Sequence, residues 1–110
     1  MKHEMGLQNK WFDAIESGRK KFELRLFDDK RKQINVGDTI VFTSKDGRKL
    51  KREVVCIIRE QTFMSLAARF PLVWNLASDD VTSDDMLKLM EKFYPVEKQE
   101  KLGVVAIGLQ

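Results

Sequence analysis

The chain has few residues that form disulfides, bind metals or stiffen the backbone: one cysteine, one histidine and two prolines among 110 residues. A lone Cys56 cannot form an internal disulfide, and with a single histidine it offers no ligand set for structural zinc. The longest apolar segments, 54–58 and 104–107, are far shorter than the roughly 20 residues of a membrane-spanning helix. The N-terminal residues lack the apolar stretch of a secretory signal. We therefore predict a cytoplasmic protein with no membrane span and no metal.

Charge is unevenly distributed along the sequence. The net charge is +3, but residues 1–60 carry 15 Lys and Arg against 10 Asp and Glu, whereas residues 61–110 carry 5 against 7. The first part would attract a polyanion such as a nucleic acid. Ordinary solvated charge is the alternative, because 34% charged residues is only somewhat above average usage. With 43% hydrophobic residues, a chain of this length can bury one core, so we expect a single domain over residues 1–110.

Hydrophobic periodicity predicts a mixed, β-rich chain. An Asp46-Gly47 turn is typical of a hairpin, and the apolar run 54–58 predicts a strand covered on both faces, with Cys56 buried in it. Residues 72–77 are ambiguous. Four or five strands with two or three helices favour an α+β fold, a small mixed β-barrel whose closure removes exposed edges. The expected helices cover 8–17, 63–69 and the segment between Thr82 and Pro95, and the expected strands cover 21–26, 39–43, 49–58 and 102–109.

The segment from Gly18 to Arg25 holds the strongest candidate chemistry. Gly18 ends the first helix and lets a ligand approach the main chain, although a plain helix cap explains it too. Lys20 should project from the turn into the mouth of the strand, to meet a phosphate or act as a base, unless it is a solvated surface lysine. Glu23 and Arg25 share one strand face. Arg25 suits a phosphate or a guanine edge and Glu23 an amino group, or the two form a structural ion pair.

Written as Gly18-x-Lys20-x-x-Glu23-x-Arg25, this segment resembles the motif of the ASCH domain family, a branch of the PUA-like barrels. The order of elements around it, from the preceding helix to the final 103–107 strand, is similar to that family over nearly the whole chain. The resemblance implies a pseudo-barrel with a cleft beside the motif. It also implies a role in binding RNA or in processing RNA-derived nucleosides.

A related branch, the acetylcytidine amidohydrolases, suggests an enzymatic alternative. In that branch the motif lysine acts with a threonine three positions later and with a downstream acid before the last helix. Here Glu23 occupies the place of the threonine, and a carboxylate is a poorer choice for that chemistry. Asp79 and Asp80 lie in the region of the downstream acid, although exposed acids before a helix explain them as well. The alternative is thus a hydrolase of a modified nucleoside or of RNA, with Lys20 and Glu23 in acid and base roles.

Other candidates are weaker. Trp11, Trp74 and Phe70 are more typical of core residues than of stacking platforms, Tyr94 is explained by packing, and His3 has no visible partner. The sequence contains no phosphate-binding glycine loop, zinc motif or nucleophile elbow, so we predict no cofactor. We predict RNA or a modified nucleoside as the partner, contacted by Gly18, Lys20, Lys21, Glu23 and Arg25. A basic patch comprises Arg48, Lys49, Lys51 and Arg52. It either contacts an RNA backbone or is a charged hairpin tip that prevents aggregation.

Overall fold

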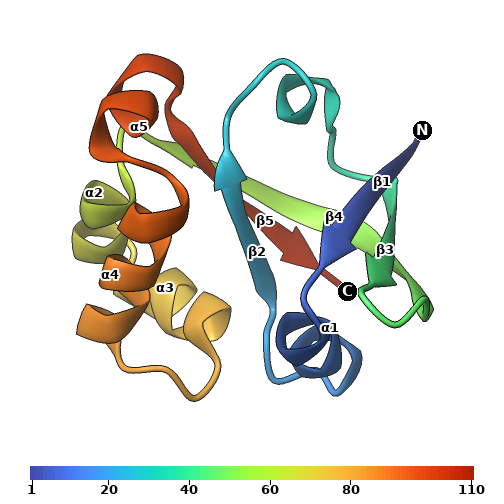
Figure 1. Cartoon of the computed structure of the whole chain (residues 1–110). Helices are drawn as coiled ribbons and strands as arrows, with labels where there is room; N and C mark the ends of the chain where they lie inside the picture. The colour runs from blue at the N-terminus through green and yellow to red at the C-terminus, as the bar shows by residue number, and fades with distance from the viewer.

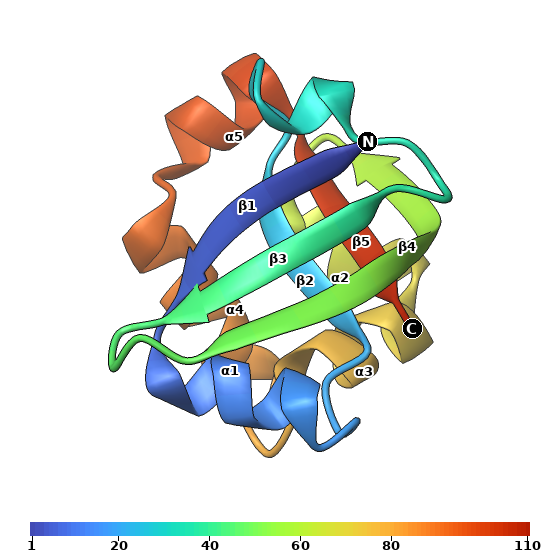
Figure 2. The same ribbon diagram turned by 90° about the vertical axis from the view of Figure 1, so that its right-hand side faces the viewer.

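Five strands form one strongly curled sheet in the order β1-β3-β4-β5-β2 (Figure 1). The computed structural model describes all of residues 1–110. β1 pairs parallel with β3, and every other neighbouring pair is antiparallel. The long strand β4 pairs first with β3 and then with β5, so it carries the sheet around its curl, with β2 and β5 behind β1 and β3 (Figure 2). The strands are β1 (Lys2–Leu7), β2 (Phe22–Leu26), β3 (Thr39–Ser44), β4 (Lys49–Glu60) and β5 (Val104–Leu109).

The helices occupy two places around this sheet. One helix lies at an end of the curl, and the other four gather on the outer side of β2 and β5 (Figure 1). The predicted α+β, PUA-like barrel fold is confirmed as a half-barrel, with more helices than the two or three expected. No helix is long and apolar enough to cross a membrane. In chain order the helices are α1 (Asn9–Glu16), α2 (Phe63–Arg69), α3 (Pro71–Ser78), α4 (Ser83–Phe93) and α5 (Val96–Leu102), and a 3-10 turn covers Arg31–Gln33.

The last strand, β5, separates two hydrophobic cores. All six of its residues are buried, and they alternate between the two sides. Val105 and Ile107 join the core inside the curl, whereas Val104 and Ala106 join the core between the sheet and α2, α3 and α4. Fully burying such a side chain contributes roughly 1.5–3 kcal/mol, so β5 is a main source of cohesion. Trp74, as predicted for a core residue, is fully buried in the second core, on α3.

Three elements were absent from the sequence-based prediction: α3, which covers the ambiguous residues 72–77, β1 and α5. β1 was missed, and it gives His3 a partner after all: the imidazole Nε2 lies 2.8 Å from Asp38 Oδ2. That hydrogen bond, with the Asn35 N–H, lowers the pKa of Asp38 to about 2. α5 was missed because its sequence is mostly polar; it is anchored by the buried Gln99, which accepts from the Phe63 N–H and donates to the Tyr94 carbonyl.

The prediction that the 54–58 segment is covered on both faces was wrong. The pairing of β4 with β5 shifts between Val54 and Cys56, which is a bulge. Such a bulge kinks the strand and leaves the extra residue unpaired. Val55 is 38% exposed as a result, and Cys56 is only half-buried.

Candidate ligand-binding site at the open seam

The curled sheet is not closed by strand pairing, because β1 and β2 are its two edges. A side chain spans the gap instead: Arg25 on β2 donates through Nη2 to the carbonyl oxygen of Gly6 on β1, at 2.8 Å. We call this gap between β1 and β2 the seam. A cavity of about 180 Å³ opens there, the seam cavity, lined by Gly6, Leu7, Gln8, Trp11, Lys20, Glu23, Leu24, Arg25, Met86, Met90, Phe93 and Tyr94.

The sequence explains why Glu23 and Arg25 reach the seam. In β2, Leu24 and Leu26 face the helices, so the alternation of the strand turns Glu23 and Arg25 to the other side, as predicted. Arg25 Nε donates to Glu23 Oε2 at 2.8 Å. Burial disfavours the guanidinium, but the Glu23 carboxylate outweighs it and raises the pKa of Arg25. The predicted pairing of these two side chains is therefore present.

Lys20 forms the buried end of the cluster. Its Nζ donates to the carbonyl oxygen of Ala77 at 2.6 Å and lies 3.6 Å from Glu23 Oε1 and 5.1 Å from the centre of the Trp11 ring. Ala77 is in the last turn of α3, where the helix dipole favours a cation. Lys20 is 3% exposed, and this burial lowers the pKa of its ammonium although the Glu23 carboxylate opposes the shift. Burial thus disfavours the charged form of Lys20, whereas the neighbouring carboxylate favours it.

Not all polar groups of the cluster are occupied by one another. Arg25 uses Nε and Nη2, while Nη1 has no hydrogen-bond partner. The only buried side-chain nitrogen or oxygen without a partner is Nε of Arg31, so Arg25 Nη1 must reach solvent. The same reasoning applies to the hydroxyl of Tyr94, which lines the seam cavity and forms no hydrogen bond. Two residues that line the seam cavity, Arg25 and Tyr94, therefore each carry a solvent-reachable polar atom without a partner.

The free edge of β2 adds main-chain groups. The Lys21 carbonyl accepts from the Leu109 N–H, and the Phe27 N–H donates to the Gly103 carbonyl, so odd-numbered residues of this segment bond to β5. In an antiparallel pair the intervening residues point their N–H and C=O away from the partner strand. Leu24, which lines the seam cavity, therefore presents a main-chain donor and acceptor on the unpaired side.

Aromatic and thioether side chains form the remaining wall. Phe93 is 45% exposed, and Trp11 and Tyr94 are half-buried. The sequence interpretation of Trp11 as a core residue and of Tyr94 as simple packing was incomplete, because both also line the seam cavity. Met86 and Met90 complete the wall from α4. Their helical spacing is the same for a core face and for a cavity wall, so no sequence signal distinguishes the two.

The motif and the whole fold match a known family. The model of the ASCH domain matches residues 5–110. The chain belongs to the ASCH domain family. The resemblance predicted from the Gly18–Arg25 motif is confirmed.

Solved structures similar to this ASCH domain cover 97–100% of its length. The crystal structure of hypothetical protein PH0355 is 36% identical, with a TM-score of 0.87, covering 100% of this chain and 98% of that one. The solution structure of protein PF0455 from Pyrococcus furiosus is 34% identical, with a TM-score of 0.75, covering 100% and 96%. A mutant of ZmASCH from Zymomonas mobilis is 15% identical, with a TM-score of 0.66, covering 97% and 66%; it shows the shared fold alone. No curated protein matches the chain.

Three residues predicted to contact a ligand or act in catalysis, Gly18, Lys21 and Asp79, do not line the seam cavity of the ASCH domain. Gly18 ends α1 with φ of 84°, the conformation expected of a glycine cap, and it lines a second hollow together with Lys21. Asp79 follows α3 and accepts from Arg19 Nε at 3.0 Å. Its φ of 53° makes Asp79 the only non-glycine residue with a positive φ. No three His, Cys, Asp or Glu side chains gather closely enough to hold a metal ion.

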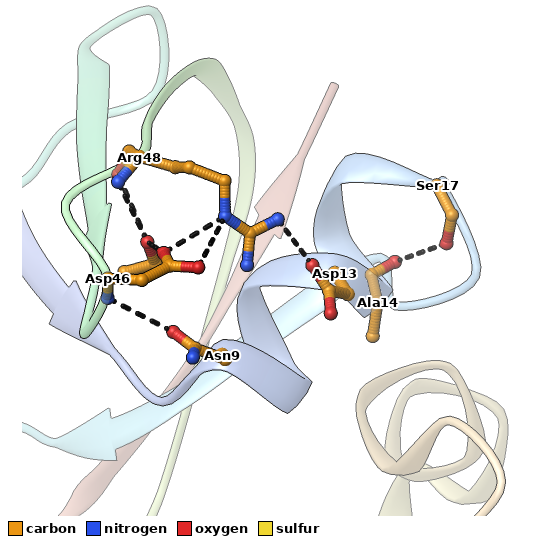
Figure 3. Close-up of polar contacts among 7 residues, drawn as sticks. Asn9, Asp13, Ala14, Ser17, Asp46 and Arg48 are labelled. Atoms are coloured by element: carbon orange, nitrogen blue, oxygen red, sulfur yellow. Dashed lines mark hydrogen bonds and ion pairs between the residues drawn. The ribbon is translucent and has the colours of Figure 1, made fainter.

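The basic patch of the ASCH domain is divided by the geometry of β4. Arg48 connects the hairpin to α1, because Nη1 donates to Asp13 at 2.7 Å and Nε to Asp46 at 3.0 Å, while the Asp46 N–H reaches Asn9 (Figure 3). Strand alternation then places Lys49 and Lys51 on the exposed outer face and Arg52 on the opposite side. Of these four cations only Arg52 lies near the motif, beside Lys20 and Lys21.

Proposed function

We propose that this ASCH domain binds RNA by holding one base, ordinary or modified, in the seam cavity. The observation that carries the proposal is the combination of residues there: aromatic and thioether side chains line the cavity together with Arg25, whose Nη1 is unengaged, and with Leu24 on the free edge of β2. A nucleobase has the matching surfaces, with two π-faces and an edge of donors and acceptors. A phosphate alone would leave the wall unused.

The size of the seam cavity limits the ligand. Drug-sized ligands need about 300–1,000 Å³, whereas a cavity of about 150 Å³ accommodates a benzene ring. At about 180 Å³, the seam cavity has room for one base ring. The sugar and phosphates must therefore leave through the mouth at the seam. A base presented by single-stranded RNA fits this requirement, because its ring can turn away from its neighbours.

The buried ion cluster supports recognition indirectly. Glu23 is 6% exposed and its carboxylate is already engaged by Lys20 and Arg25. We assign Glu23 and Lys20 to positioning Arg25, which then contacts the base edge through Nη1. Held at Nε and Nη2, the guanidinium loses little further freedom when it binds. This role needs neither Lys20 nor Glu23 to be exposed.

The test is a binding titration with short single-stranded RNAs and with the separate nucleosides, followed by the signal of the Trp11 indole. Phe93→Ala removes an exposed ring from the wall, and base stacking is worth about 1–3 kcal/mol, so affinity should fall about 5- to 150-fold. Met64→Ala on α2 is the matched control, since Met64 is an exposed apolar residue outside the cavity. Equal affinity of Phe93→Ala and wild type for every RNA and nucleoside would contradict the proposal.

A hydrolase of a modified nucleoside is the second candidate. It is supported by one observation: burial lowers the pKa of Lys20 while the residue lines the seam cavity beside Glu23. A lowered pKa makes the neutral amine, the form that can accept a proton, easier to reach. The discriminating assay is release of acetate from acetylcytidine, which Lys20→Met should abolish while Lys51→Met, at an exposed lysine that lines neither hollow, retains it. Without turnover by wild type, the binding function alone remains. A cytoplasmic location stays a prediction.

A further inference from the structure

A second hollow lies on the other side of the Gly18–Lys21 turn. Its volume is about 270 Å³, and it lies between the last turn of α1, the start of β2, β4 and the end of β5. Figure 2 shows α1 and the C-terminus at the same end of the molecule. Lys20 lines both this hollow and the seam cavity. We call this second hollow the basic hollow, because its charged residues are Lys20, Lys21 and Arg52.

Arg52 is unusual among the arginines. Five of the seven pair with a carboxylate, and Arg59 lies over the ring of Phe27 at 4.0 Å. Arg52 has neither kind of partner: its guanidinium donates only to the main-chain oxygens of Lys51, at 2.9 Å, and Glu16, at 3.3 Å. A guanidinium has five N–H donors, so most of the donor capacity of Arg52 remains unused beside the basic hollow.

No acidic side chain lines the basic hollow. Lys21 forms no ion pair, and none of the residues lining the basic hollow is Asp or Glu. Glu23 pairs with Lys20 at 3.6 Å, whereas Glu16 and Glu53 meet the hollow's other residues only through their main chains. The fold therefore places Lys21 and Arg52 beside one hollow with no carboxylate side chain paired to either, and an anion in the basic hollow would supply the missing counter-charge.

Gly18 leaves space at the same place. Its φ of 84° excludes most side chains, and an added Cβ would lie 3.5 Å from Lys21 Nζ. With no Cβ there, a ligand can approach the main chain next to the lysine ammonium. The main-chain oxygen of Gln110, which also lines the hollow, already accepts from the Glu53 N–H. The unengaged groups of the basic hollow therefore include the cations of Lys21 and Arg52 and the side-chain amide of Gln110, which can donate to an anion.

We propose that the basic hollow is a phosphate-binding site, with Arg52 and Lys21 as its ligands and Gly18 as its close-approach point. Arginine matches a phosphate with paired N–H donors, and lysine adds a point charge. That this phosphate belongs to RNA rests on the proposed function. In that case the chain passes over the Gly18–Lys21 turn, with a base in the seam cavity and a phosphate in the basic hollow.

The experiment is an amide NMR titration at constant ionic strength, with inorganic phosphate in one arm and a trinucleotide RNA in the other. Phosphate should shift the amides of Gly18 and Lys21, and Arg52→Gln or Lys21→Gln should weaken its binding at least 5-fold. Lys51→Gln is the matched control, because Lys51 neighbours Arg52 on β4 but faces outward; it should leave phosphate binding unchanged. For RNA, Arg52→Gln should reduce the slope of log affinity against log salt by about 1.

The two proposals fail in different ways. Phosphate that leaves the Gly18 and Lys21 amides unmoved, or that binds Arg52→Gln as well as wild type, overturns the phosphate site even if nucleosides still perturb Trp11. Phosphate that binds as expected while no RNA or nucleoside perturbs Trp11 overturns the RNA assignment and the proposed function, and leaves the anion site standing. Dispersed amide spectra of each variant show that folding is retained.

Discussion

Arg25 should hold the barrel together at its seam, and replacing it tests the geometry on which the site depends. Arg25→Met keeps the length of the aliphatic stem but removes the only side-chain hydrogen bond between β2 and β1, from Nη2 to the Gly6 carbonyl. It also removes the hydrogen bond to Glu23. The pair is largely buried, with side chains 15% and 8% exposed.

The expected loss follows from these two contacts. A hydrogen bond to a charged group contributes about 1.5–3 kcal/mol, and the one to the exposed Gly6 carbonyl belongs at the lower end because water can replace the guanidinium. Removing one partner of a buried ion pair costs about 3–5 kcal/mol. Lys20 still faces Glu23 at 3.6 Å, so the carboxylate is not left unpaired and the lower end applies. We expect Arg25→Met to lower the free energy of unfolding by about 3 kcal/mol.

The assay is equilibrium unfolding in urea, combined with amide hydrogen exchange. β1 is joined to the sheet on one side only, by β3. Its amides should therefore lose protection in Arg25→Met, whereas those of β5, paired on both sides, should change only with global stability. Where Arg25→Met does not fold, Arg25→Lys, which keeps the charge but not both contacts, gives an intermediate loss.

Arg48→Met is the matched control. Arg48 also contacts two partners, Asp13 and Asp46, but its side chain is 41% exposed and solvent screens the interaction. It should therefore cost clearly less than Arg25→Met. An equal loss in the two variants, or unchanged exchange of the β1 amides in Arg25→Met, would refute the view that Arg25 closes the seam.

Two further predictions concern Lys20 and Asp79. The pKa of Lys20 is lowered below its ordinary 10.5 in the folded protein. Between the folded pKa and 10.5 the unfolded chain therefore binds more protons than the folded one, and the free energy of unfolding should rise with pH. Urea unfolding from about pH 7 to 10.5 should show this rise in wild type, and Lys20→Met should remove it. An equal pH dependence in both proteins would show that the ammonium is not desolvated. Asp79 has a φ of 53°, which glycine adopts without strain. Asp79→Gly and Asp79→Ala both lose the contact with Arg19, but only the alanine keeps the backbone strain. Asp79→Gly should therefore be more stable than Asp79→Ala by about 1 kcal/mol in thermal or urea unfolding. Equal stability of the two variants would mean that the backbone there relaxes freely.

The local part of the fold was predictable and the missed elements have physical reasons. The alternation of β2 and the glycine cap at Gly18 depend on neighbouring residues, so the sequence indicates them directly. In β1, buried and exposed residues alternate too, but a histidine and a glycine interrupt the hydrophobic pattern. The inward His3 is tolerated because Asp38, far along the chain, forms a hydrogen bond with its imidazole. α5 likewise depends on a buried Gln99 that bonds to two distant main-chain groups.

The candidate site shows the same division. The motif predicts Glu23 beside Arg25, because two positions on one strand face must be neighbours. It does not predict that Lys20 ends beneath them, since this depends on the Ala77 carbonyl at the end of α3. Nor does it predict the wall, because Trp11 and Phe93 come from helices at opposite ends of the sequence. The basic patch was divided for a simple reason: consecutive residues of a strand point to opposite faces, so a continuous run of cations in the sequence is not one surface.

The seam links stability to binding in one residue. A fully closed barrel would satisfy the edges of β1 and β2 with each other and leave no unpaired main chain near the motif. Here a single guanidinium replaces strand pairing, and its long side chain holds the two edges apart enough for the seam cavity to exist. Binding a base against Arg25 Nη1 should then also protect β1, because the ligand and the Gly6 carbonyl hold the same group. Phe93→Ala separates these two effects, because the Phe93 ring contributes to the wall of the cavity and not to the contact between β1 and β2. It should weaken ligand binding but leave the protection of the β1 amides in the free protein unchanged.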